Sequence, residues 1–245
     1  TDATPMTLAD ASWQPWSAMV DESERPYVRW FIGASTNASF NEVDRHVLSG
    51  YGEETALISE IAEGTAPGLT NRRQLLINST LAAHALLTLR ADPESLERVA
   101  FYLPNDTHAV VWIEAARRLG APYTAVAAGT ASASLASRLE NTGATLLVTS
   151  AELYDLVNEA CQMVPQPTEV VAISRNGESV PSGWHDASAL LSTASAQLGI
   201  DEPAKFGDIE LVQKVWSLVP PKPVDASHPL FVLYTSGSTG KPKGI

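Results

Sequence analysis

The sequence predicts an α/β protein with a mostly parallel sheet flanked by helices, and three patterns lead to this prediction. After residue 70, short apolar runs alternate with helical stretches of about 10 to 15 residues. The apolar runs show no polar alternation, which is typical of strands buried on both faces. Helical stretches end on glycine at Gly120 and Gly143. Together these patterns indicate βαβ units.

The chain divides into two parts by pattern. Residues 1–70 are predicted to form an irregular segment that packs on the core, and residues 71–245 carry the regular alternation. Aromatic side chains usually anchor such a segment on a neighbouring surface. We expect that role for the four aromatic residues Trp13, Trp16, Tyr27 and Trp30.

Each regular element has its own signal. An apolar stripe at helical spacing predicts a helix over 74–90, and the apolar run 99–103 predicts a buried strand that ends at Pro104. Asp106 is the expected N-cap of a helix that runs through residue 119 and ends at Gly120. The same reasoning predicts strand 123–126, helix 132–142, strand 145–149, a helix after Ser150, strand 169–173 and a helix over about 186–198.

Charge and composition limit the function. The 245 residues carry 16 Lys and Arg against 28 Asp and Glu, a net charge of −12, so no nucleic-acid partner is expected. No apolar run reaches the ~18 residues of a membrane span, and residues 1–5 lack a signal-peptide pattern. The single cysteine, Cys161, favours a reducing compartment, and we expect a cytoplasmic protein in which Cys161 is a small buried apolar side chain.

The segment 235–244 carries the strongest chemical signal. It follows the apolar run 230–234, read as a buried strand, and phosphate loops of open α/β sheets lie at the carboxyl ends of strands. Glycines allow close backbone approach to an anion, hydroxyls add donors, and lysines add positive charge. The predicted ligand contacts are Thr235, Ser236, Gly237, Ser238, Thr239, Gly240 and Lys241, with Lys243 as a neighbouring charge for which direct contact stays open.

Two other readings of this segment are less favoured. A flexible Gly/Ser linker would not need the apolar run that leads into it. A Walker A loop spaces its glycines further apart and places Ser or Thr after the lysine, whereas here Pro242 follows Lys241. All five lysines lie at position 205 or later, and two lie in the last five residues. Positive charge is therefore concentrated at the predicted phosphate loop.

The eleven residues 234–244, Tyr-Thr-Ser-Gly-Ser-Thr-Gly-Lys-Pro-Lys-Gly, resemble the phosphate loop of the adenylate-forming superfamily. The blocks 29–46, 99–105 and 115–122 resemble the acetyl-CoA synthetase branch. Residues 13–16, 37–46, 50–52 and 223–226 are most similar to the ligase portion of the propionyl-CoA synthases, which are multifunctional fusion enzymes. The resemblance covers the beginning of such a ligase, so 71–245 is identified as the first part of an AMP-binding domain.

The resemblance implies an acid–thiol ligase that works in two steps. A short carboxylic acid, such as 3-hydroxypropionate, propionate or acetate, attacks ATP to give acyl-AMP, and CoA then displaces AMP. It implies ATP, Mg²⁺ and CoA, with the loop holding phosphates, and NADPH only if a reductase is fused. It also implies that the catalytic residues and the partner ligase subdomain lie downstream of Ile245. No metal-ligand set is predicted within the sequence itself.

Some positions depart from the family pattern or carry no clear role. Gly129 and Arg138 lie where a CoA contact is conceivable, but a turn glycine and a solvated helix cation are favoured. For Asp44, Arg45 and His46, a packed and hydrogen-bonded role is favoured over catalysis. Two other functions stay open. The chain could be a non-catalytic scaffold or docking piece, or part of an amino-acid adenylation domain that serves a phosphopantetheine carrier.

Overall fold

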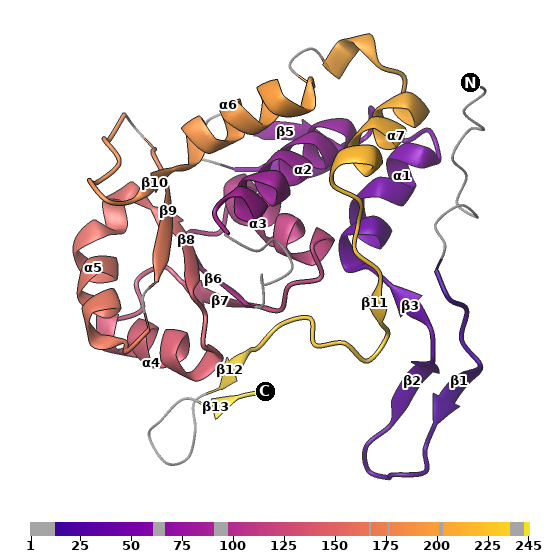
Figure 1. Ribbon diagram of the computed structural model, residues 1–245, viewed down its shortest axis with the longest axis horizontal. Helices are drawn as coiled ribbons and strands as arrows, with labels where there is room; N and C mark the ends of the chain where they lie inside the picture. The colour runs from indigo at the N-terminus through magenta and orange to yellow at the C-terminus, as the bar shows by residue number, and fades with distance from the viewer. Residues whose placement is uncertain are drawn as a thin grey trace.

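The computed structural model describes residues 13–60, 67–90, 98–166, 168–175, 177–200, 203–235 and 243–245. A five-stranded sheet with the order β10-β9-β8-β6-β7 forms the centre, and every pairing in it is parallel (Figure 1). Its strands are β6 (Val99–Leu103), β7 (Tyr123–Ala127), β8 (Leu146–Ser150), β9 (Glu169–Ile173) and β10 (His185–Asp186). The predicted α/β class with a parallel sheet is confirmed.

Helices cover both faces of this sheet. The helices are α1 (Arg45–Leu48), α2 (Arg72–Thr88), α3 (Thr107–Arg118), α4 (Ser132–Thr142), α5 (Tyr154–Met163), α6 (Ala187–Leu198) and α7 (Asp208–Leu218). Figure 1 shows α4 and α5 on one face, and α2, α3 and α6 on the other. Single turns of π-helix (Phe40–Asp44) and 3₁₀-helix (Ala151–Leu153 and Pro203–Lys205) complete the helical elements of the described ranges.

The helices bury both faces of the sheet, and successive side chains of a strand point to opposite faces. Phe101 of β6 belongs to the core with α2 and α3, whereas its neighbour Tyr102 belongs to the core with α4 and α5. All five residues of β6 and all five of β8 are buried. This explains why these strands appear in the sequence as unbroken apolar runs.

The helix ends follow the capping rules that predicted them. Asp106 accepts a hydrogen bond from the backbone N–H of Ala109 and caps α3, and Gly143 ends α4 in the left-handed conformation. α2 begins with a capping box in which the side chains of Asn71 and Gln74 each accept from the other's backbone N–H. Helix α7 was not predicted, since residues 174–229 offered mixed signals.

The N-terminal segment contains short regular elements rather than irregular chain alone. Two-stranded antiparallel ribbons are formed by β1 (Ala18–Asp21) with β2 (Arg29–Ile32) and by β4 (Thr55–Ser59) with β5 (Gly68–Asn71). A third pairing joins β3 (Ser35–Thr36) to β11 (Val224–Asp225). These strands lie outside the central sheet. The division at residue 70 stays a prediction.

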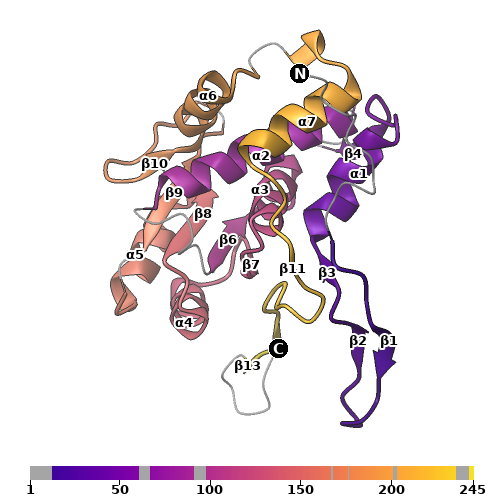
Figure 2. The same cartoon turned by 45° about the vertical axis from the view of Figure 1, so that its right-hand side comes forward.

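The expected anchoring by aromatic residues holds at only one of the four positions. Trp13 packs on Phe40 with the ring centroids 4.9 Å apart. Trp16, Tyr27 and Trp30 are 53%, 77% and 56% exposed, so for them the prediction is wrong. The physical reason is their place on or beside the β1–β2 ribbon, which extends away from the sheet in both views (Figures 1 and 2).

The apolar run 230–234 is not the buried strand that the sequence predicts. It forms one isolated parallel bridge to β7, between Phe231 and Tyr123, and only its last residue enters a named strand. Phe231 and Leu233 are exposed. An apolar run has the same pattern in the core and at a sheet edge, so periodicity could not separate the two cases.

Candidate functional site

The predicted phosphate loop emerges from a short antiparallel ribbon, β12 (Tyr234–Thr235) with β13 (Lys243–Gly244). Thr235 lies opposite Lys243, and reciprocal hydrogen bonds of 3.0 and 2.8 Å join Leu233 to Ile245 just outside the ribbon. The structure thus brings together the two predicted site residues at the ends of the segment. The others, Ser236, Gly237, Ser238, Thr239, Gly240 and Lys241, lie outside the described residues.

The chain enters this ribbon alongside the edge strand β7. The N–H of Tyr123 donates to Leu230 O at 3.2 Å, and the N–H of Val232 donates to Tyr123 O at 2.8 Å. The hydroxyl of Thr124 also donates to Val232 O, at 3.0 Å. Because the bridge is parallel, residues 230–235 run in the same direction as β7. This segment, the first stem of the loop, therefore leads toward the carboxyl edge of the sheet, where open α/β sheets bind ligands.

The first stem also contacts α4. The hydroxyl of Tyr234 donates a 2.6 Å hydrogen bond to Asn141 Oδ1, and the guanidinium carbon of Arg138 lies 5.2 Å from the Tyr234 ring centroid. Burial raises the pKa of Tyr234, an effect that nearby Arg138 partly opposes, so the phenol keeps its proton at neutral pH. Arg138 is partly exposed on α4, and the Tyr234 ring is a partner that the sequence analysis did not predict. Its aromatic partner lies far along the chain, and no local pattern marks it.

Gly129 takes the conformation expected of a turn glycine. Its φ is +93°, and its N–H donates to the hydroxyl oxygen of Tyr102 at 3.0 Å. That hydroxyl in turn donates to Thr130 O at 2.9 Å. These two hydrogen bonds of Tyr102 therefore fix the conformation of the turn that follows β7.

Asp44 has the packed, hydrogen-bonded role that the sequence analysis favoured for the block 44–46. Both carboxylate oxygens of Asp44 lie 2.9 Å from Arg118 Nη1, and Trp216 Nε1 donates to Asp44 Oδ1 at 2.7 Å. Arg45 reaches Asn41 Oδ1 at 3.3 Å. Burial, with help from nearby arginines, lowers the pKa of His46. Asp44 thus holds the N-terminal segment on the core, whereas Arg45 is exposed and bonds within its own segment.

Asn37 also joins several segments in this region by hydrogen bonds, and no sequence pattern predicted this role. Its Nδ2 donates to three carbonyls, those of Arg117 at 2.8 Å, Arg118 at 3.1 Å and Lys222 at 2.9 Å. Its Oδ1 accepts from the N–H of Phe40 at 3.0 Å. One buried amide thus joins the N-terminal segment, the end of α3 and the connection that leads to the phosphate loop.

A hollow of about 750 Å³ lies at the carboxyl ends of β6, β8 and β9. It includes the point where the strand order reverses, between β6 and β8, which is the usual ligand position of such sheets. Arg175 forms an ion pair there with Asp106, and its Nε lies 3.9 Å from Glu152 Oε1. The two carboxylates offset the guanidinium charge, so Arg175 does not present an uncompensated cation to a phosphate.

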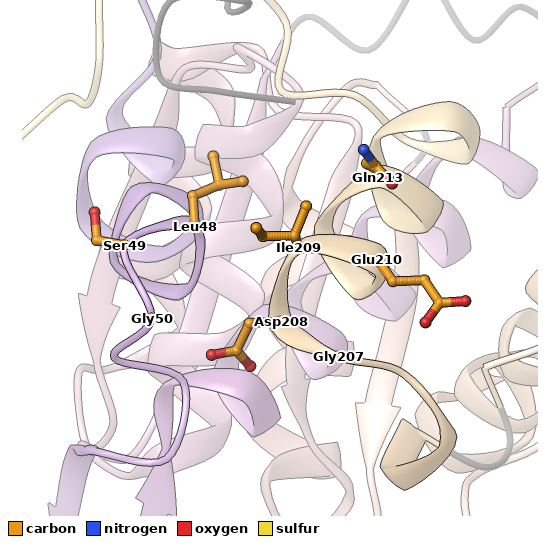
Figure 3. A pocket seen from close by; sticks show the side chains of 8 residues that line it. All are labelled: Leu48, Ser49, Gly50, Gly207, Asp208, Ile209, Glu210 and Gln213. Carbon is orange, nitrogen blue, oxygen red and sulfur yellow. The ribbon is translucent and has the colours of Figure 1, made fainter. Parts of the chain in front are cut away.

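A second hollow, of about 660 Å³, lies between α1 and the start of α7 (Figure 3). Asp208, the first residue of α7, accepts from the N–H of Gly52 at 3.3 Å and forms an ion pair with Arg73. Both ribbon views place this region at the opposite end of the molecule from β12 and β13. It is therefore separate from the predicted phosphate loop.

Within the described ranges, no group of three or more His, Cys, Asp or Glu side chains is placed to hold a metal ion. No helix of the same part of the chain combines the length and apolar character needed to cross a membrane. Cys161 is half-buried on α5, and burial raises the pKa of its thiol.

Comparison with known proteins gives consistent results. The model of the family described as AMP-binding enzyme matches residues 45–245. The chain is 35% identical to the acetyl-coenzyme A synthetase of Paraburkholderia phymatum, over 96% of this chain and 34% of that protein. It is 34% identical to the acetyl-coenzyme A synthetase of Burkholderia lata, over 95% of this chain and 34% of that protein.

A solved structure gives the same fold. Acetoacetyl-CoA synthetase from Streptomyces lividans aligns with a TM-score of 0.72 and 26% identity, over 96% of this chain and 33% of that one. The chain spans about a third of the length of the relatives it matches. Since the family model covers most of the sequence and the fold agrees, the chain belongs to the AMP-binding enzyme family.

Proposed function

We propose that this chain is the N-terminal part of an AMP-forming acyl-CoA ligase that activates a short carboxylic acid. The observation that carries the proposal is the segment 235–244, a phosphate-loop sequence whose two ends pair as a ribbon beside the parallel sheet. The acetyl- and acetoacetyl-CoA synthetases that match the chain support this reaction class. Cytoplasmic location is part of the proposal and agrees with the single cysteine.

In the proposed reaction, the loop binds MgATP. Backbone N–H groups near Gly237 and Gly240, the flanking hydroxyls and Lys241 would hold the β- and γ-phosphates, with Lys243 as a nearby charge. The acid's carboxylate oxygen attacks the α-phosphorus, and the bond to pyrophosphate breaks. The CoA thiol then displaces AMP. In this scheme the loop of this chain positions ATP, and the chemistry of both steps needs groups from the remainder of the ligase, since this chain covers about a third of the relatives' length.

The finer substrate proposal is 3-hydroxypropionate, with the chain as the ligase portion of a propionyl-CoA synthase. The support is the local resemblance of residues 13–16, 37–46, 50–52 and 223–226 to that group. Propionate and acetate are the alternatives within the same ligase class. NADPH enters the proposal only with a fused reductase.

ATP–pyrophosphate exchange by the complete polypeptide that carries this chain tests these proposals. The panel contains acetate, propionate, 3-hydroxypropionate and acrylate, with an amino-acid mixture as a separate arm. We expect exchange that depends on a short acid, and strongest exchange with 3-hydroxypropionate. Exchange only with amino acids would favour an adenylation domain. No exchange in either arm would favour a scaffold role and contradict the ligase proposal.

A further inference from the structure

Tyr234, the residue before the phosphate loop, is held at two points by one helix. Its hydroxyl donates to Asn141 Oδ1 at 2.6 Å, and its ring faces the Arg138 guanidinium at 5.2 Å. Arg138 and Asn141 are three residues apart on α4, so their side chains lie on the same face of the helix. The contact thus fixes both the position of the phenol and the orientation of its ring.

The second stem of the loop, β13, packs against the same Tyr234–Asn141 contact. Gly244 is the ladder partner of Tyr234. A Cβ at Gly244 would lie 2.9 Å from Val232 Cγ1, 3.3 Å from Asn141 Oδ1 and 3.4 Å from Tyr234 Cε1. The glycine therefore allows the second stem to approach the Tyr234–Asn141 pair. Both ends of the loop are set against α4 by this pair.

Further contacts hold α4 in place on its side of the contact with Tyr234. Arg138 Nη1 donates to Ser134 O at 3.0 Å and also bonds the Ser134 hydroxyl, so the guanidinium is oriented by its own helix. On the other side of α4, Leu135 and Leu139 are fully buried in the core with β6 and β8. The contact connects the ribbon to a part of the structure that cannot easily shift, because close-packed interiors resist displacement.

We propose that Asn141 and Arg138 are positioning residues for the phosphate loop, acting through Tyr234. The proposal rests on the proposed function, since these residues would affect ATP only through the loop. Because Tyr234 and Gly244 are fixed against α4, the positions at which the chain enters and leaves the loop are set before a polyphosphate binds. Such preorganisation raises affinity without a new contact to the ligand. Arg138 also adds a positive charge beside the stem of a chain that is acidic as a whole.

The test is the affinity of the complete polypeptide for MgATP, measured by calorimetry, with thermal stability measured in parallel. Tyr234→Phe removes the hydrogen-bond donor, and Asn141→Ala removes the acceptor. Each should weaken binding by about threefold to tenfold, the range for one hydrogen bond. The double variant should bind about as well as either single variant, because both changes remove the same bond. Arg138→Met should also weaken binding.

Two variants separate positioning from general damage. Asn141→Asp keeps an acceptor for the phenol and should recover most of the affinity lost in Asn141→Ala. Tyr154→Phe removes a hydroxyl from a tyrosine on α5, whose ring packs on Trp184, and should leave affinity unchanged. Failure of the wild-type protein to bind MgATP would contradict the proposed function itself.

Three results would overturn the inference while leaving the proposed function intact. The first is wild-type affinity in both Tyr234→Phe and Asn141→Ala. The second is equal loss in Asn141→Ala and Asn141→Asp, which would show that the acceptor is not what matters. The third is a loss of affinity in proportion to a fall in melting temperature across the variants, which would assign the contact to stability alone.

Discussion

Asp44 and Arg118 form a fully buried ion pair that joins the N-terminal segment to the end of α3. Both carboxylate oxygens of Asp44 lie 2.9 Å from Arg118 Nη1, and neither side chain is exposed. Arg118 Nε donates to Val219 O at 2.7 Å, so the pair also holds the end of α7. A buried charge without its partner is strongly unfavourable.

We therefore expect Asp44→Ala to lower the free energy of unfolding by about 3 to 5 kcal/mol, because it leaves the Arg118 charge buried and unpaired. Urea denaturation measures the change. The control is Glu22→Ala, which removes the partner of Arg25 in an exposed pair and should cost at most about 1 kcal/mol. Similar values for the two variants would contradict the structural role given to Asp44.

Glu114 should make stability depend on pH. Burial raises its pKa from 4.5 to about 7; neighbouring Glu42 adds to this effect, and Arg117 opposes it. The folded state holds this proton more tightly than the unfolded state. The stabilisation is complete below about pH 4.5 and is lost as the pH rises through about 7, a change of about 3 kcal/mol.

The measurement is the free energy of unfolding from about pH 5 to about pH 8, compared between wild type and Glu114→Gln. The wild type should lose stability relative to Glu114→Gln as the pH rises. Glu178→Gln changes an exposed carboxyl and should follow the wild type. Parallel pH profiles of wild type and Glu114→Gln would show that Glu114 does not titrate in this range.

Gly120 should tolerate a side chain poorly. Its φ is +64°, and an added Cβ would lie 2.7 Å from Val224 Cγ1 on β11. Gly183 also has a positive φ, +87°, but no heavy atom lies within 4 Å of its added Cβ. We expect Gly120→Ala to destabilise the protein by about 1 to 3 kcal/mol more than Gly183→Ala, because contact is added to backbone strain. Equal thermal shifts would contradict the close approach of β11.

Lys241 is predicted to contact the ATP phosphates. Lys241→Ala should raise the KM for ATP in pyrophosphate exchange by about 10- to 100-fold, the range for a hydrogen bond to a charged group. Lys214→Ala is the matched control, because that ammonium lies over the Phe206 ring, and it should leave the KM for ATP unchanged. Equal KM values for the two variants would remove Lys241 from the binding site.

The fold was largely predictable where local signals act alone. Apolar runs marked β6, β8 and β9, and side-chain caps and glycines marked the ends of α3 and α4. The run 230–234 was misassigned because an edge segment and a core strand have the same apolar pattern.

The candidate site was predictable only in part, for a different reason. The sequence of 235–244 indicates phosphate binding by itself, through its residue types and spacing. The contact of Tyr234 with Asn141 joins residues 93 positions apart, and neither residue carries a local signal for it. Such a contact depends on tertiary packing, which a single sequence does not encode in any short pattern.

The most direct test of the account is the identity of the nucleotide product. The complete polypeptide is incubated with MgATP, CoA and a short carboxylic acid, and nucleotides and thioester are quantified together. The account predicts AMP, in equal amount to the acyl-CoA and only when the acid is present. Formation of ADP in place of AMP, or no acid-dependent nucleotide turnover with any acid of the panel, would contradict it.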